Sequence, residues 1–187
     1  MAKKDFKPGN MLYPVPVALI TCGDFDGESN VLTIAWTGTI CSDPAMVSIS
    51  VRPERHSYGM IKKNMEFVIN LVNEKLTRAT DYCGVKSGKD VDKFKESSLT
   101  KERATVVKAP LIAQSPVNIE CRVRQIIPLG SHDMFLADVV AVHVDDKYID
   151  EKGKFCFEST EPVVYSHGEY YGLGRLIGNF GYSVKKK

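Results

Sequence analysis

The sequence predicts a mainly β protein, a β-barrel closed on itself with short helices inserted between its strands. Stretches rich in β-branched residues and bounded by turn-forming residues recur along most of the chain. Only two segments have helical character, and they do not alternate regularly with the strands as in a parallel α/β sheet. With 187 residues the chain can bury a sizeable core, so we expect one domain over residues 1–187, with its core at about 12–181.

The first third of the chain reads as three strands joined by turns. These strands are expected over residues 15–22, 31–38 and 46–52. In the third strand, apolar residues at 47, 49 and 51 alternate with polar residues at 48, 50 and 52. One face of this strand is therefore apolar and the other polar, which indicates an antiparallel sheet.

Two helices are expected next, over residues 56–64 and 74–84, with a strand at 66–72 between them. The second helix should end at Gly84, because glycine readily takes the left-handed closing conformation. The segment 85–100 that follows is polar and irregular. Long connections of this kind are more often functional than short ones.

The second half of the chain again has strand character. Strands are expected over residues 105–109, 117–129 and 134–144 and around Phe155 and Phe157. The segment GEYYGLGRLIGNFGYSV at 168–184 is too aromatic for a flexible linker and too rich in glycine for a good helix. We expect it to pack against a surface, which another subunit could provide.

Composition excludes several classes of protein. Hydrophobic residues make up 43% of the chain and charged residues 26%, as in ordinary soluble globular proteins. The net charge is only +2 and the single basic run, Lys185 to Lys187, reads as a solvated tail, so no nucleic-acid partner is expected. No segment resembles a signal peptide or reaches the roughly 18 apolar residues of a membrane span. We therefore expect a cytoplasmic protein without a membrane partner.

The five cysteines and four histidines form no metal-binding or disulfide pattern. The cysteines are odd in number, scattered and never arranged as CxxC, so they are expected to be reduced thiols. The histidines form neither an HxH nor an HExxH motif. No metal site is expected.

Two glycine-rich segments resemble nucleotide-binding motifs but depart from them. GVKSGKD at 84–90 is one residue short between its glycines, and Asp90 stands where Ser or Thr would bind magnesium in a P-loop. GLGRLIG at 172–178 has the spacing GxGxxxG with no βαβ unit after it. Neither a P-loop nor a Rossmann site is expected.

The segment VRPERHSYG at 51–59 is a candidate anion site. Arg52 and Arg55 can form charge-assisted hydrogen bonds with phosphate oxygens. Ser57 falls at the expected start of a helix, where free backbone N–H groups and the positive end of the dipole favour an anion. The alternative is that Ser57 simply caps the helix and the arginines are solvated.

Trp36 is the only tryptophan, and it lies in the polar stretch TIAWTGTICSD at 33–43. Tryptophans usually belong to the core. The neighbours Thr37, Gly38 and Thr39 instead favour a place in the wall of a site. Both interpretations remain open from the residues alone.

Taken together, these segments resemble the flavin reductase-like family, the FMN-binding split barrels, and in particular its flavoredoxin branch. The resemblance runs from about Leu12 to Gly181. It rests on the order and spacing of NVLTIAWTG, ICSDPAMVSISVRP, VRPERHSYG, EFVINL, CGVKSGKDVDKF, LGSHDMFLADVV and YYGLGRLIG. The resemblance implies a Greek-key split β-barrel that holds FMN at the interface of a homodimer.

The resemblance also implies a set of cofactor-binding residues. Lys93 matches a lysine near the flavin, where a cation beside N1 and O2 favours the anionic reduced ring. His132 matches a residue that borders the cofactor and could take part in catalysis. Cys41 lies in a matched segment but shows no pattern of a reactive thiolate. The implied cofactor-binding set is Asn30, Thr33, Trp36, Thr37, Ser50, Val51, Arg52, Arg55, His56, Ser57, Cys83, Lys89, Lys93, His132 and Tyr165.

The implied function is an NAD(P)H-dependent flavin or ferric reductase. FMN would take a hydride from NADH or NADPH and pass electrons to a redox partner protein or a small-molecule acceptor. No separate nicotinamide-binding domain is visible, so donor and acceptor would use the same flavin face in turn. Two alternatives remain open. One is a flavoredoxin-like FMN electron carrier with little NAD(P)H activity, and the other a protein of the same fold that binds flavin structurally or binds haem.

Overall fold

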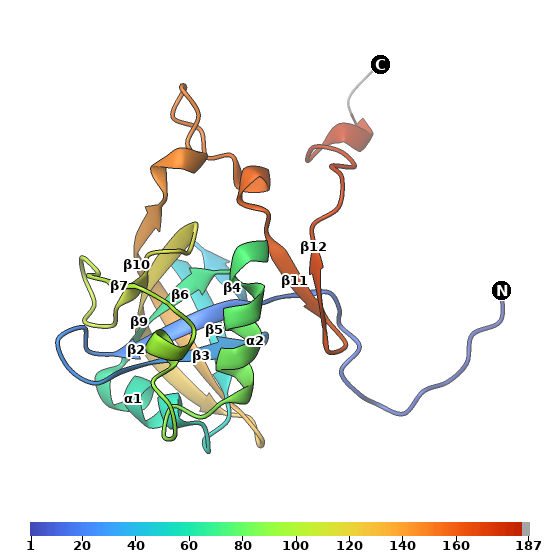
Figure 1. The fold of residues 1–187 in the computed structure, drawn as a ribbon. Coiled ribbons are helices and arrows are strands. Elements are labelled where there is room, and N and C mark those ends of the chain that lie inside the picture. Colours follow the sequence, from blue (N-terminus) through green and yellow to red (C-terminus); the bar gives the residue numbers. More distant parts are fainter. Residues whose placement is uncertain (185–187) are drawn as a thin grey trace.

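The computed structural model describes residues 1–184, so the basic tail Lys185 to Lys187 lies outside the described residues. Its main element is a seven-stranded antiparallel sheet in the order β3-β2-β6-β9-β10-β5-β4 (Figure 1). These strands are β2 (Ala18–Gly23), β3 (Ser29–Ile34), β4 (Thr37–Ser42), β5 (Ala45–Val51), β6 (Glu66–Leu71), β9 (Val117–Pro128) and β10 (Asp133–Val144). The prediction of a mainly β split barrel is confirmed.

Two smaller sheets accompany the large one. The strands β1 (Val15–Pro16), β11 (Val163–Ser166) and β12 (Glu169–Gly172) form one sheet, and β7 (Lys101–Glu102) pairs with β8 (Leu111–Ile112). Pairing of β1 with β11 brings residues 15–16 beside residues 164–165. The hairpin of β11 and β12 stands beside the barrel, and both terminal segments extend away from it (Figure 1).

Three α-helices lie between the strands: α1 (His56–Asn64), α2 (Thr77–Val85) and α3 (Lys93–Glu96). The predicted helix over 56–64 is confirmed. The predicted end of the second helix at Gly84 is wrong, since α2 continues to Val85. A Cβ atom on Gly84 would lie 3.3 Å from Cβ of Thr33, so this glycine allows α2 to pack closely on β3. The short 3₁₀ turns are η1 (Glu74–Leu76), η2 (Asp146–Tyr148), η3 (Phe157–Thr160) and η4 (Tyr182–Val184).

The predicted strand over 31–38 is interrupted. Its first part belongs to β3, which ends at Ile34, and β4 begins only at Thr37. Trp36 therefore lies at the bend between two strands, where its backbone carbonyl accepts a hydrogen bond from Ser50 N–H at 2.8 Å. The strand expected around Phe155 and Phe157 is also wrong, because Phe155 forms only an isolated bridge with Ile149 and Phe157 begins η3.

Two groups of buried apolar residues lie on opposite faces of the sheet. Ile20 belongs to the cluster inside the barrel, with Ile49, Phe67 and Phe135. Its neighbour Leu19 belongs to a second cluster, which packs under α2 and α3. Successive residues of a strand point to opposite faces, so β2 contributes to both clusters. This second cluster fixes α2 and α3 beside β3.

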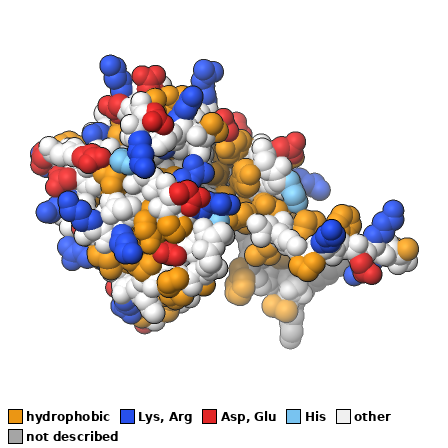
Figure 2. Space-filling model, turned by 90° about the horizontal axis from the view of Figure 1, so that it is seen from below, with side chains coloured by type: hydrophobic (Ala, Val, Ile, Leu, Met, Phe, Trp, Pro, Cys, Tyr) orange, Lys and Arg blue, Asp and Glu red, His pale blue; other side chains and the backbone are white. Residues whose placement is uncertain are grey.

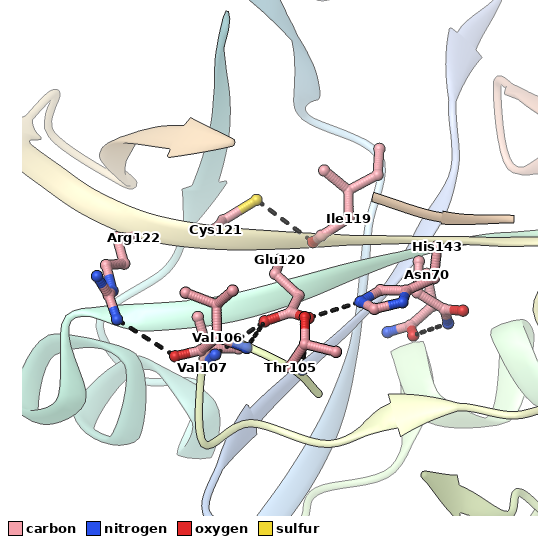
Figure 3. A network of polar contacts seen from close by, with 10 residues as sticks. Asn70, Thr105, Val106, Val107, Ile119, Glu120, Cys121, Arg122 and His143 are labelled. Atoms are coloured by element: carbon pink, nitrogen blue, oxygen red, sulfur yellow. Dashed lines mark hydrogen bonds and ion pairs between the residues drawn. The ribbon is translucent and has the colours of Figure 1, made fainter. Parts of the chain in front are cut away.

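The segment 105–109 was predicted as a strand, and this prediction is wrong. Its backbone N–H groups at Thr105, Val106 and Val107 donate to the carboxylate of Glu120, at 2.7 to 2.8 Å, instead of to a neighbouring strand (Figure 3). The Thr105 hydroxyl and Nε2 of His143 also donate to Glu120, at 2.8 and 2.6 Å. One buried carboxylate therefore holds an irregular loop against β9 and β10.

These donors keep Glu120 ionised although its side chain is fully buried. Burial alone would raise its pKa, but the hydrogen bonds from His143, Thr105 and Val107 outweigh this and lower the pKa to about 2. We call this group of residues the Glu120 network. Within residues 1–184, none of the helices has the length and apolar character that a membrane crossing requires.

Candidate functional site

Two adjoining cavities lie where β3, the end of β5, the start of α1 and the segment 84–93 meet. The first, about 420 Å³, we call the polar cavity, and its lining is Asn30, Leu32, Arg52, Glu54, Arg55, His56, Ser57, Lys86, Ser87, Gly88 and Lys93. The second, about 360 Å³, we call the aromatic cavity, and its lining is Val17, Leu32, Thr33, Ile34, Ala35, Trp36, Ser50, Arg52, Arg55, Gly84, His132, Tyr165 and Tyr170. Leu32, Arg52 and Arg55 line both cavities, so the two are continuous parts of one site.

Lys93 provides a buried positive charge in the polar cavity. Its side chain belongs to α3, and the residue is only 3% exposed. The ammonium group donates to the carbonyls of Val31 and Cys83, at 2.9 and 2.7 Å. Among residues 1–184, no carboxylate lies within 4.0 Å of it. An ammonium group has three N–H donors, so one remains for a ligand.

Burial lowers the pKa of Lys93 below its ordinary value. The cause is the loss of water around the charged form. An anion in the cavity would oppose this effect and stabilise the ammonium form. The buried lysine therefore favours a negatively charged ligand.

The start of α1 provides a second favourable place for an anion. The residue before this helix is Arg55, and within the described part of the chain no side chain caps the first turn, which contains no acidic residue. The hydroxyl of Ser57 instead accepts a hydrogen bond from Nδ2 of Asn30 at 2.8 Å. The simpler interpretation of Ser57 as a helix cap is thus wrong. The free N–H groups and the dipole of α1 remain available to a ligand.

The segment Lys86 to Gly88 forms the opposite wall of the polar cavity. Its sequence was set aside because its glycine spacing does not match a P-loop. A Cβ atom on Gly88 would lie 2.4 Å from Oδ1 of Asn30, so only glycine lets this segment lie so close to β3. Lys86, Ser87 and Gly88 are site residues that the sequence analysis missed. The sequence signal for these residues was a lysine and a serine next to a glycine. It was overlooked because the segment was compared only with the P-loop spacing.

Arg52 and Arg55 line both cavities, and His132 lines the aromatic cavity with them. Nη1 of Arg55 donates to the Gly84 carbonyl at 3.3 Å, which directs this guanidinium toward α2. Burial, followed by the charges of Arg52 and Arg55, lowers the pKa of His132. The neutral imidazole is therefore favoured, and it can donate or accept one hydrogen bond at each nitrogen according to its tautomer.

Aromatic rings form the far wall of the aromatic cavity. Trp36, Tyr165 and Tyr170 line it directly, and the rings of Tyr165 and Tyr170 are 5.7 Å apart. Tyr13 supports them from behind, with its ring centroid 6.2 Å from that of Trp36 and 6.3 Å from that of Tyr165. Tyr13 and Tyr170 were not predicted from the sequence. Tyr13 precedes β1, which pairs with β11, and Tyr170 lies on β12 opposite Tyr165 of β11.

Two side chains in this region donate hydrogen bonds to groups of α2. The Thr33 hydroxyl donates to the carbonyl of Thr80 at 2.5 Å. The Tyr170 hydroxyl donates to Asp81 at 3.2 Å, and burial together with the charge of Asp81 raises the pKa of Tyr170 to about 12. These bonds fix the position of α2 relative to the aromatic wall.

The structure brings most of the predicted site residues together. Those that line the polar or the aromatic cavity are Asn30, Thr33, Trp36, Ser50, Arg52, Arg55, His56, Ser57, Lys93, His132 and Tyr165. Four others line neither cavity. Val51 and Cys83 have their side chains in the core clusters, Thr37 donates to the Ser48 carbonyl, and Lys89 lines a neighbouring cavity.

Neither cysteine of the matched segments, Cys41 or Cys83, lines the polar or the aromatic cavity. Burial raises the pKa of Cys83, so its neutral thiol is favoured. Cys41 lies on β4 and lines neither cavity. In the part of the chain that the structure describes, His, Cys, Asp and Glu nowhere gather in a group of three or more that could hold a metal ion.

The chain is an antiparallel split barrel whose cationic cavity opens into an aromatic one. These features define a class of protein that is suited to bind an anionic molecule with a flat ring. Comparison with protein families makes the assignment specific. The model of the flavin reductase like domain matches residues 10–174, and the chain belongs to this family.

Similar proteins agree with the family assignment. An uncharacterized protein of Pyrococcus abyssi is 34% identical over 131 residues, which cover 70% of this chain and 74% of that protein. The structure of flavoredoxin from Desulfovibrio vulgaris (Miyazaki F) aligns with a TM-score of 0.90 and 28% identity, over 98% of this chain and 100% of that one. Flavoredoxin from Methanosarcina acetivorans aligns with a TM-score of 0.86 and 24% identity, over 98% and 100%.

Proposed function

We propose that the protein binds FMN across the polar and aromatic cavities and acts as an oxidoreductase. Lys93 is the observation that carries this proposal. It is a buried cation with an unused N–H group and no carboxylate partner among residues 1–184, and it lines the polar cavity. A structural lysine would be paired or solvated, because an uncompensated buried charge is costly.

The polar cavity fits the phosphate and the ribityl chain of FMN. Arg52 and Arg55 can form charge-assisted hydrogen bonds with phosphate oxygens, and the start of α1 offers free backbone N–H groups. Asn30 and Ser57 are buried and polar, and they can exchange hydrogen bonds with ribityl hydroxyls. Because these groups suit a phosphate, they favour FMN over riboflavin, which has none.

The aromatic cavity fits the isoalloxazine ring. Trp36 and Tyr165 present flat apolar faces, and the bend between β3 and β4 exposes backbone groups for the polar edge of the ring. Bound FMN would supply hydride acceptance at N5 and transfer of one or two electrons. The chain itself would hold the ring, exclude water with its aromatic wall and place neutral His132 near the ring edge.

We infer that the electron donor is NADH or NADPH and the acceptor is a flavin, ferric iron or a redox partner protein. Membership of the flavin reductase family supports this activity. The second candidate is an FMN electron carrier with little NAD(P)H activity, and the 28% identity with Desulfovibrio vulgaris flavoredoxin favours it. In either case donor and acceptor would meet the same exposed ring face in turn, which predicts ping-pong kinetics.

We also infer a homodimer, and the surface of the single chain supports it. Its accessible area is 12104 Å². A compact monomer of 20.8 kDa exposes about 8,900 Å². An excess of about 3,000 Å² per chain is about 6,000 Å² for two chains, at the upper end of the total area that obligate dimers bury. Leu176, Ile177 and Phe180, at 79%, 87% and 106% exposed, lie on the C-terminal segment. Figure 2 shows hydrophobic side chains along the segments that project from the body of the molecule.

The homodimer would also give the segment 168–184 the surface that the sequence analysis expected for it. The inferred compartment is the cytoplasm, in agreement with five unpaired cysteines. A mass measurement in solution across a range of protein concentrations tests the dimer. A monomer at micromolar concentrations would overturn it.

Anaerobic spectroscopy of the purified protein tests the proposed cofactor and donor. We expect a yellow protein with the absorption of oxidised flavin, which releases FMN on denaturation. Addition of NADH or NADPH without oxygen should bleach this absorption within seconds if the protein is a reductase. Slow or absent bleaching would favour the carrier. A colourless protein that fails to bind added FMN would overturn the proposed function.

A further inference from the structure

One side of α2 packs on the barrel, and the opposite side is open to solvent. The helix lies against β3 (Figure 1), and its buried residues are Thr80 and Cys83. Residues three or four apart share a face of a helix, so positions 75, 78, 82 and 85 form one outward stripe along η1 and α2. We call this stripe the α2 face, and it consists of Lys75, Arg78, Tyr82 and Val85.

The α2 face carries positive charge that the chain itself does not neutralise. Lys75 and Arg78 are exposed, and among residues 1–184 no carboxylate lies within 4.0 Å of either. Two acidic residues flank the stripe, but both turn toward β12. Asp81 accepts a hydrogen bond from the Tyr170 hydroxyl, and the carboxylate of Glu74 lies against the backbone of β12. The two cations therefore remain available to an acidic partner.

A groove of about 530 Å³ runs beside the α2 face. Its lining combines the two cations with the ring of Tyr82 and the apolar side chain of Leu99. Ser97 and Ser98 add hydroxyl groups, which can donate hydrogen bonds to a carboxylate. Glu96 is the one carboxylate among the lining residues, so the groove is cationic on balance. Such a groove suits an acidic segment of a protein chain.

The α2 face borders the cavities that would hold flavin. Val85 is 71% exposed and directly follows Gly84, which lines the aromatic cavity. The Gly84 carbonyl also accepts a hydrogen bond from Arg55, which lines both flavin cavities. A protein bound to the α2 face would therefore lie at the edge of the proposed flavin site without filling either cavity.

We propose that the α2 face and its groove dock an acidic redox protein, which exchanges electrons with the bound flavin. This inference rests on the proposed function, since it assigns a surface to the redox partner. Complementary charge guides such encounters, and Tyr82 and Val85 provide an apolar centre within a charged rim. A second copy of this chain is a poorer occupant, because a two-fold axis would bring the same cations face to face.

Two haem proteins of opposite charge serve as probes of the α2 face. The acidic probe is the soluble domain of cytochrome b5, and the basic probe is cytochrome c. The protein is loaded with FMN, reduced with one equivalent of dithionite and mixed with each oxidised probe in a stopped-flow instrument. Each two-electron-reduced flavin can reduce two haems, with release of one proton. The haem absorbance gives the second-order rate constant.

The test variant carries Lys75→Gln together with Arg78→Gln. Both side chains are exposed and line neither flavin cavity, so FMN binding should be unchanged. The matched control carries Lys152→Gln together with Lys154→Gln. It removes the same number of exposed positive charges from the loop between η2 and η3.

At low ionic strength the test variant should lower the rate constant with cytochrome b5 by about fivefold or more and raise that with cytochrome c. Salt at about 0.5 M should remove most of both differences, because it screens charges at the surface. The control should change neither rate constant by more than about twofold.

Equal effects of the test and control variants, or a lower rate constant with both probes, would overturn the inference while leaving the proposed function intact. A weaker homodimer in the test variant, measured as mass in solution, would assign the α2 face to contact between copies and would also overturn the inference. A wild-type protein that binds no FMN would overturn the proposed function and this inference with it.

Discussion

Two buried side chains of opposite charge, Glu120 on β9 and Lys93 on α3, differ in their surroundings. Glu120 is 0% exposed and accepts five hydrogen bonds from the loop at 105–107 and from His143. Lys93 is 3% exposed, donates two hydrogen bonds and lines two cavities. The fold itself satisfies the carboxylate, whereas it leaves the ammonium with a free donor.

This difference separates a structural charge from one kept for a ligand. Removing a fully bonded buried charge leaves its buried hydrogen-bond partners unsatisfied. The resulting loss of folding stability is among the largest that a single substitution causes. Removing an unmatched buried charge relieves a desolvation cost, and the loss falls on ligand binding instead. The two residues should therefore respond oppositely to substitutions that remove their charge.

The largest expected effect is that of Glu120→Gln on stability. The amide nitrogen would face backbone N–H groups that now donate to a carboxylate, so we expect a loss of about 3–5 kcal/mol in the free energy of unfolding. Urea denaturation monitored by circular dichroism measures it. Glu66→Gln is the matched control, because among residues 1–184 Glu66 accepts only the Lys108 N–H, and its loss should cost about 1 kcal/mol. Equal effects of the two substitutions would contradict the importance of the Glu120 network.

Acid should weaken the same network in the wild-type protein. The pKa of Glu120 is lowered to about 2 in the folded state, against about 4.3 in an unfolded chain. Its contribution is therefore complete above about pH 4.3 and is lost as the pH falls through the folded-state value, for a total of about 3 kcal/mol. Denaturation between pH 5 and pH 2 measures this slope, and Glu120→Gln should make it shallower. A slope unchanged by the substitution would assign acid sensitivity to other carboxylates.

Lys93→Met should have the opposite profile. We expect FMN affinity to fall by about thirtyfold, which is about 2 kcal/mol, because a buried charged contact with the ligand is lost. The free energy of unfolding of the apoprotein should change by no more than about 1 kcal/mol, since the desolvation cost of the ammonium disappears with its two hydrogen bonds. Fluorescence titration and urea denaturation measure the two quantities. A large loss of stability with unchanged FMN affinity would make Lys93 a structural residue like Glu120.

A smaller effect is expected for Arg55→Ala, because Arg55 is more exposed than Lys93. FMN affinity should fall by about tenfold, as for the loss of one charge-assisted phosphate contact, with little change in stability. Fluorescence titration of FMN provides the measurement, and Arg103→Ala is a control, since Arg103 pairs with Asp26 outside both flavin cavities. Unchanged affinity in Arg55→Ala would remove this residue from the site.

Features of the fold that follow local sequence patterns could be predicted, and features that depend on distant residues could not. The helix at 56–64 and the long strands at 117–129 and 134–144 were predicted because their patterns are local and regular. The prediction of a strand at 105–109 was wrong, because N–H groups of this segment donate to the carboxylate of Glu120, about 15 residues further along the chain. No local pattern of residues 105–109 contains that information.

The site residues also divide into those that could be predicted from the sequence and those that could not. Asn30, Arg52, Arg55 and Ser57 could be placed through their motifs and through the family resemblance, and the structure brings them to one cavity. Tyr13 and Tyr170 were missed because strand pairing brings them to the site: β1, which follows Tyr13, pairs with β11, and Tyr170 of β12 lies opposite Tyr165 of β11. Their ring-to-ring contacts depend on tertiary structure that single-sequence patterns do not describe.

The pairing of β1 with β11 has a consequence for the order in which the site is made during translation. Every residue of the polar cavity lies within the first 93 residues, whereas Tyr165 and Tyr170 are synthesised more than 70 residues later. A nascent chain therefore carries its phosphate-binding groups well before the aromatic wall exists. Flavin can be fully enclosed only after residue 170 has left the ribosome, so cofactor loading should follow synthesis of the β11–β12 hairpin rather than that of the polar cavity.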